Sequence, residues 1–120
     1  MVHVLLVEDS DADALLIREA LRRSPIPADL VIAWDGEQAS DLLESAHSFN
    51  LIILDLNIPK VDGHRLLNRL RRQDRLPVVV FSSSDGITDK EKALALGFTS
   101  YISKPISLGL LRSELARLLP

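Results

Sequence analysis

The run Val4-Leu5-Leu6-Val7 is short and apolar, and it stops at two carboxylates, Glu8 and Asp9. Three later apolar runs also end on a polar side chain: LIIL on Asp55, VVVF on Ser82 and YIS on Lys104. If these runs are neighbouring parallel strands, their polar ends meet at one edge of the sheet, where open α/β sheets bind ligands. Crowded carboxylates repel one another and need positive charge nearby. A divalent cation together with Lys104 would supply it, so the pattern predicts a metal site that handles phosphoryl groups.

Segments with helical spacing lie between these runs, which predicts a parallel sheet with helices on both faces. Strands are expected at residues 4–7, 30–34, 51–54, 78–81 and 100–103. Five helices are expected between and after these strands. The first begins at the capping residues after Asp9, the second runs from Gly36 through Ala46, and the third follows a turn at 58–63. The fourth covers about 88–96 with Gly97 as its cap, and the fifth covers 108–118. In the last helix Leu110 and Leu119 exceed one core-facing stripe, which predicts a weak homodimer contact there.

Length and composition limit the function classes that fit. The five strand–helix units use all 120 residues, so a single domain over 1–120 is expected. A net charge of −3 argues against a nucleic-acid surface, and the absence of Cys excludes disulfides and thiol catalysis. With no signal peptide or span-length apolar stretch visible, we expect a cytoplasmic protein without membrane contact.

With these residues in place, the chain resembles the receiver domain of two-component response regulators. The segments that carry the resemblance are VLLVEDS, LIILDLNIPKVDG, LPVVVFSSS and YISKP, in this order. It implies a flavodoxin-like, doubly wound, five-stranded parallel sheet of order 2-1-3-4-5 with five helices. The segment VEDSDADALLIREAL further resembles small regulators that pair with phytochrome-type histidine kinases. The implied function is a phosphorylation-dependent signalling switch that catalyses only its own aspartyl phosphorylation and dephosphorylation.

The resemblance also implies a role for each residue of the predicted metal site. Asp55 would accept the phosphoryl group, because a carboxylate can form an aspartyl phosphate. Glu8, Asp9 and Asp55, with the backbone carbonyl of Asn57, would hold Mg²⁺, for which Mn²⁺ would substitute. Lys104 would pair with a phosphoryl oxygen.

Two further residues would report the phosphorylation state. Ser82 would hydrogen-bond the phosphoryl group as the switch hydroxyl, although Ser83 and Ser84 beside it leave the register open. Tyr101 resembles the switch aromatic, and an ordinary half-buried strand tyrosine is an equal alternative. The Lys104-Pro105 bond is expected to be cis, since X-Pro bonds adopt this form at low cost.

The expected partners are a sensor histidine kinase or a histidine phosphotransferase, and a downstream protein that reads the fourth helix, fifth strand and fifth helix. Two other functions compete. A phosphatase of the haloacid dehalogenase type also uses an aspartyl nucleophile, but it needs an Asp two residues later, where this chain has Asn57. A degenerate receiver that serves only as a docking module would not need the complete acid set.

Overall fold

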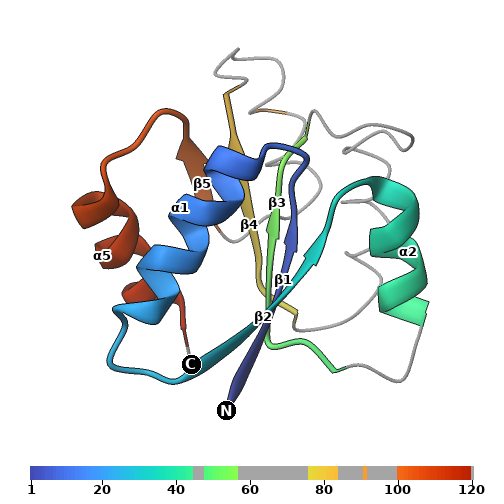
Figure 1. Cartoon of the computed structure of the whole chain (residues 1–120), viewed down its shortest axis with the longest axis horizontal. Coiled ribbons are helices and arrows are strands. Elements are labelled where there is room, and N and C mark those ends of the chain that lie inside the picture. The colour runs from blue at the N-terminus through green and yellow to red at the C-terminus, as the bar shows by residue number, and fades with distance from the viewer. Residues whose placement is uncertain (45–47, 57–75, 84–90, 92–99, 120) are drawn as a thin grey trace.

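A sheet of parallel strands forms the centre of the computed structural model, which describes residues 1–44, 48–56, 76–83, 91 and 100–119. Its order is β2-β1-β3-β4-β5, as the resemblance implies (Figure 1). The strands are β1 Val2–Val7, β2 Ala28–Ala33, β3 Leu51–Leu54, β4 Val78–Ser82 and β5 Ser100–Ser103. Because all five run in the same direction, their carboxyl ends meet at one edge, at the top in Figure 1.

Three described helices cover the two faces of the sheet. They are α1 Asp11–Arg22, α2 Gly36–Glu44 and α5 Leu108–Leu118. The first begins at Ser10, whose hydroxyl accepts a hydrogen bond from the Asp13 amide, and the last begins at Ser107 in the same way. In α2 the Asp35 carboxylate accepts from the Gln38 amide. Helices α1 and α5 lie together on one face and α2 lies on the other (Figure 1).

The sheet divides the core into two apolar clusters. Alternate side chains of β1, β3 and β4 point to opposite faces, because successive residues of a strand alternate in direction. Val4 and Leu6 pack with α1 and α5, whereas Leu5 and Val7 pack on the face that α2 covers. The four residues of β3 are all fully buried, as the unbroken apolar run predicts for a central strand. Because β3 is held by packing on both faces, the position of Asp55 directly after it is fixed as well.

Strand boundaries differ from the sequence prediction where pairing, rather than hydrophobicity, sets the limit. β1 and β2 begin earlier than expected because Val2 pairs with Ala28. β2 ends at Ala33, not Trp34, since the Trp34 amide donates to the Gln38 side chain at 2.9 Å instead of to the sheet. Ser82 is the last residue of β4 rather than the residue after it.

One expectation for the last helix is wrong. Leu119 is only 7% exposed and packs in the core, because its amide still donates to the Leu115 carbonyl at 2.8 Å and it continues the buried stripe of Leu111 and Leu115. Leu110, by contrast, is 63% exposed. The helices expected after the 58–63 turn and over 88–96, with Ala46 and Gly97, lie outside the described residues apart from Glu91. None of the helices that the structure describes has the length and apolar character needed to cross a bilayer.

Candidate metal and phosphoryl site

Glu8 and Asp55 leave the sheet side by side. Val7 pairs with Leu54 in the register of β1 and β3, and the Asp55 amide donates to the Val7 carbonyl at 3.0 Å. The Glu8 amide is held in turn by the Ala33 carbonyl of β2 at 3.0 Å. The backbone therefore sets both carboxylates at the carboxyl edge of the sheet, where the alternation of strands and helices predicts them.

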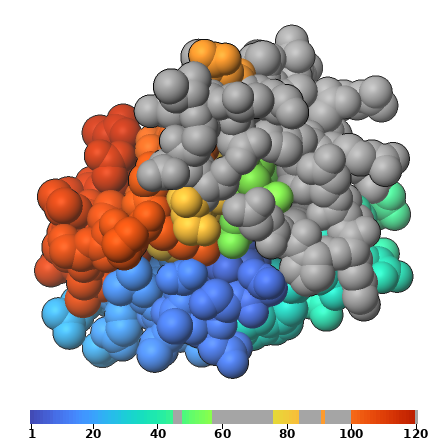
Figure 2. Space-filling view, turned by 90° about the horizontal axis from the view of Figure 1, so that it is seen from above, coloured from blue at the N-terminus to red at the C-terminus, as the bar shows by residue number. Residues whose placement is uncertain are grey.

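Asp9 completes a cluster of three carboxylates. One carboxylate oxygen from each of Glu8, Asp9 and Asp55 lies within 4.8 Å of the other two. Glu8 and Asp55 are buried, whereas Asp9 is exposed. The cluster lines an open cavity of about 450 Å³, whose other lining residues are Ser10, Asp13, Ser83, Lys104 and Pro105. Figure 2 looks down on this end of the molecule, with residues from the ends of β3 and β4 visible between the N-terminal and C-terminal segments.

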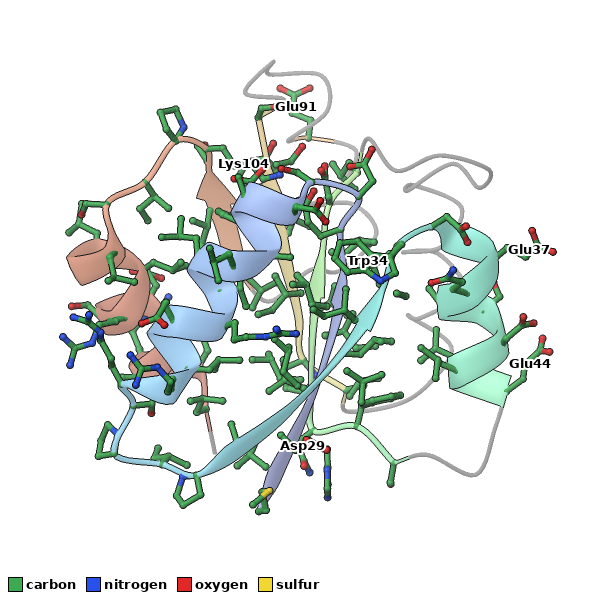
Figure 3. All side chains as sticks on the ribbon, viewed as in Figure 1. Asp29, Trp34, Glu37, Glu44, Glu91 and Lys104 are labelled. Carbon is green, nitrogen blue, oxygen red and sulfur yellow. The ribbon has the colours of Figure 1, made fainter. Side chains whose placement is uncertain are left out.

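Lys104 brings positive charge to the same point from the end of β5. Its amide donates to the Ser82 carbonyl at 3.0 Å, which extends the pairing of β4 and β5 by one residue. Its ammonium, labelled in Figure 3 above the sheet edge, lies 4.9 Å from the centroid of the Phe81 ring. The Lys104 side chain is only 10% exposed, so its charge acts where water screens it little.

Three carboxylates surround the Lys104 ammonium. The Nζ atom lies 2.7 Å from Glu8 Oε2, 2.9 Å from Asp13 Oδ2 and 3.1 Å from Asp55 Oδ2. Asp13 comes from the first turn of α1 and is not a member of the carboxylate cluster. Sequence reasoning missed this contact, because the pattern around Asp13 indicates only a helix-starting residue.

Burial and crowding shift the pKa of the groups that meet here. Burial raises the pKa of Glu8 to about 7, and the nearby Asp55 charge adds to the rise, although Lys104 opposes both. For Lys104, burial lowers the pKa, but the hydrogen bonds to Glu8 and Asp13 and the Asp55 charge outweigh it and raise the pKa overall. The Lys104 ammonium thus stays charged, whereas the Glu8 carboxyl beside it has its pKa close to neutral pH.

This donor set fits a hard divalent cation. Mg²⁺ takes oxygen ligands, often one or two carboxylates with phosphate oxygens and waters, and the cluster offers three carboxylates beside an open cavity. Soft metals are a poor match because the chain has no Cys. Asn57, whose carbonyl is the fourth expected ligand, lies outside the described residues.

The two expected switch residues lie on one face of the sheet. Ser82 is fully buried at the end of β4, and Tyr101 is half-buried in the cluster on the α2 side. Tyr101 pairs with Val80, two residues before Ser82, so the side chains of Ser82 and Tyr101 point to the same face. Ser83 is exposed and lines the cavity, whereas Ser84 lies outside the described residues. The Lys104-Pro105 bond is cis, the form expected for it.

Comparison with known proteins adds independent evidence. Residues 4–116 match the family described as the response regulator receiver domain. The response regulator Rcp1 of Synechocystis sp. is 37% identical over 114 residues, which cover 88% of this chain and 78% of that protein. The phosphorylated cyanobacterial phytochrome response regulator RcpA is 35% identical with a TM-score of 0.85, over 96% of this chain and 89% of RcpA. The Mn²⁺-bound form of Rcp1 is 34% identical with a TM-score of 0.85, over 98% and 91%.

Proposed function

Because the chain belongs to the response regulator receiver domain family, we propose that its Asp55 carboxylate accepts a phosphoryl group beside a divalent cation. Proteins of this family are phosphorylation-dependent switches of two-component signalling systems, and the chain is one of them. The observation that supports the proposed site is the meeting of three carboxylates and one buried ammonium at the carboxyl edge of the sheet. The family match over residues 4–116 supports one receiver domain over residues 1–120.

In the proposed reaction an Asp55 oxygen attacks the phosphorus of a donor phosphohistidine. The new O–P bond forms as the P–N bond breaks, and the imidazole nitrogen leaves with the electron pair of that bond. Lys104 Nζ, 3.1 Å from Asp55 Oδ2, donates to a phosphoryl oxygen and offsets its charge. Attack of water on phosphorus later restores the carboxylate and releases inorganic phosphate. Both steps take place on the Asp55 carboxylate of the protein itself.

Glu8, Asp9 and Asp55 would hold the cation in this proposal, with the Asn57 backbone carbonyl as a fourth protein ligand. A bound Mg²⁺ would neutralise charge that develops on the phosphoryl oxygens. We propose Mg²⁺ as the resident ion, and Mn²⁺ as a substitute, because three carboxylate ligands suit both ions. The Mn²⁺-bound form of the related protein Rcp1 supports the proposal of a divalent ion.

Ser82 and Tyr101 form the proposed switch. Their side chains share one face of the sheet, so a hydroxyl drawn toward a phosphoryl group vacates space that the Tyr101 ring can enter. Such a change would alter the surface around the fourth helix, β5 and α5, where a downstream protein would bind. Exposed Leu110 on α5 would contribute to a weak homodimer on that side.

Receiver domains interact with histidine kinases and with downstream target proteins. We propose partners of both kinds for this chain. The phosphoryl donor would be a sensor histidine kinase or a histidine phosphotransferase. Similarity to RcpA, a phytochrome response regulator, supports a kinase of the phytochrome type. We propose a cytoplasmic location and no direct contact with nucleic acid or membrane.

Phosphoryl transfer from a small donor tests the proposal. The protein is mixed with acetyl phosphate and Mg²⁺, and its intact mass is followed with time. We expect a gain of one phosphoryl group that EDTA prevents and that Asp55→Asn abolishes. Asp35→Asn is the matched control, since Asp35 is another buried Asp after a strand and Asn still caps α2. A gain of mass that survives Asp55→Asn would exclude Asp55 as the acceptor.

A further inference from the structure

We propose that Asp13 is the exchangeable partner of Lys104: it holds the ammonium in the resting protein and releases it to the incoming phosphoryl group. The inference rests on the proposed function and assigns a positioning role to a residue outside the carboxylate cluster. Asp13 belongs to the first turn of α1, and its Oδ2 atom lies 2.9 Å from Lys104 Nζ.

The hydrogen-bonding capacity of the ammonium is the first argument. A lysine ammonium has three N–H donors, and Glu8, Asp13 and Asp55 all lie within 3.1 Å of Nζ. Nζ donates hydrogen bonds to Glu8 Oε2 and Asp55 Oδ2, and Asp13 Oδ2 forms a third ion pair with it at 2.9 Å. A phosphoryl oxygen that binds Lys104 therefore competes with carboxylates that already surround the ammonium.

Cluster membership and burial distinguish Asp13 from the other two contacts. Glu8 and Asp55 belong to the cluster that would hold the cation, so a bound cation would weaken their hold on Nζ, whereas Asp13 lies outside the cluster. The Asp13 side chain is also 31% exposed, against 1% for Glu8 and 7% for Asp55, so its carboxylate regains water when it is released. Asp13 is therefore the partner that the phosphoryl group displaces.

The position of Asp13 in its helix makes its release easier still. Asp13 lies three residues after Ser10, which caps α1, so its carboxylate sits near the positive end of the helix dipole. The helix N-terminus therefore offers the Asp13 side chain positive potential in addition to that of Lys104. The resting contact thus competes with the phosphoryl group for Lys104.

Beryllium fluoride with Mg²⁺ serves as the test ligand, because it mimics a phosphoryl group on a carboxylate. Its affinity is measured by calorimetry for the wild type, Asp13→Asn and Asp11→Asn. Removal of the competing contact is expected to tighten binding roughly three- to tenfold in Asp13→Asn. Asp11→Asn removes an equal charge from the same helical turn, at an exposed residue that lines no part of the cavity, and should change affinity less than twofold.

A second measurement separates exchange of Lys104 from a general effect on the fold. In a Lys104→Gln background, Asp13→Asn should leave beryllium fluoride affinity unchanged, because the contact is already absent. Equal affinity of Asp13→Asn and the wild type would overturn the inference and leave the proposed function intact. Equal gains from Asp13→Asn and Asp11→Asn, or a gain that persists without Lys104, would also overturn it. A wild type that binds no beryllium fluoride would overturn the proposed function and the inference together.

Discussion

Lys104 Nζ lies 2.7 Å from Glu8 Oε2, although 96 positions separate the two residues in the chain. The contact joins the ends of β1 and β5, which are not neighbours in the sheet. It is possible only because parallel strands bring their carboxyl ends to one edge. The side chains of Glu8 and Lys104 are 1% and 10% exposed, so water solvates the two charges of the ion pair only weakly.

Loss of the Lys104 ammonium should therefore destabilise the protein. Removal of one partner from a buried ion pair costs about 3–5 kcal/mol, because the other charge stays buried alone. We expect Lys104→Met to lower the free energy of unfolding by about 3 kcal/mol at pH 8, and by less at pH 5, where Glu8 takes up a proton. Urea denaturation followed by circular dichroism in EDTA measures both values.

The matched control for this substitution is Arg117→Met. Arg117 pairs with Glu114 at 2.7 Å, but both side chains are more than one third exposed. An exposed pair contributes about 0–1 kcal/mol, so this variant should stay close to the wild type. Equal losses in both variants would show that burial of the Lys104 pair has no special energetic role.

The raised pKa of Glu8 predicts how the stability of the metal-free protein depends on pH. The carboxyl ionises near 4.5 in the unfolded chain but near pH 7 in the folded protein. Between these values the folded state binds more protons, so the free energy of unfolding falls as pH rises. Among described groups whose pKa departs from its ordinary value, Glu8 alone changes charge in this window. Urea denaturation in EDTA from pH 4.5 to 7.5 should show the fall, and Glu8→Gln should remove most of it. A rise over this range in the wild type would contradict the assignment.

The packing of α5 offers a test through two adjacent leucines. Leu111 is fully buried between α1 and the sheet, whereas Leu110 is 63% exposed. Truncation of a buried leucine to alanine costs about 2–5 kcal/mol, so Leu111→Ala should be strongly destabilised in urea denaturation. Leu110→Ala should stay within about 0.5 kcal/mol of the wild type. The reverse order would mean that α5 packs through its other face.

The proposed switch can be followed through Tyr101, because it is the only tyrosine of the chain. With ring-labelled tyrosine, NMR should give one signal that moves when Mg²⁺ and beryllium fluoride are added. We expect Ser82→Ala to lose this shift while still binding the ligand, since the hydroxyl couples the site to the ring. Ser83→Ala, the exposed neighbour that lines the cavity, should keep the shift. If Ser83→Ala loses it and Ser82→Ala does not, the switch hydroxyl belongs to Ser83.

Most of the fold could be predicted from the sequence because buried parallel strands read as unbroken apolar runs. The position of Asp55 follows directly from the run 51–54 that precedes it. The strand order comes from resemblance to a family, since periodicity carries no information on which strands pair. Boundaries were less accurate: Trp34 reads as a strand residue, but its amide bonds with the Gln38 side chain.

Two residues show where prediction from sequence fails. Leu119 reads as a surplus apolar residue because two leucines end the helix, and the pattern does not tell which of them is buried: Leu119 lies in the core and Leu118 is only partly buried. Asp13 reads as an ordinary acidic residue in the first turn of a helix, where the helix dipole favours acidic side chains. Its contact with Lys104 depends on the start of α1 lying close to the residue that follows β5, which only the packed structure shows. A helical side chain points toward the N-terminus of its helix. The place of Asp13 one turn after Asp9 could therefore have indicated that its carboxylate lies near the metal site.

Chemical mapping of the phosphorylated residue tests the central claim most directly. Sodium borohydride reduces an acyl phosphate to an alcohol, so an aspartyl phosphate at Asp55 is converted to homoserine. The protein is treated with acetyl phosphate and Mg²⁺, reduced, digested and sequenced by mass spectrometry. We predict homoserine at position 55, dependent on the metal and absent from Asp55→Asn. Reduction at another carboxylate, such as Asp9 or Asp35, or at none, would contradict the account.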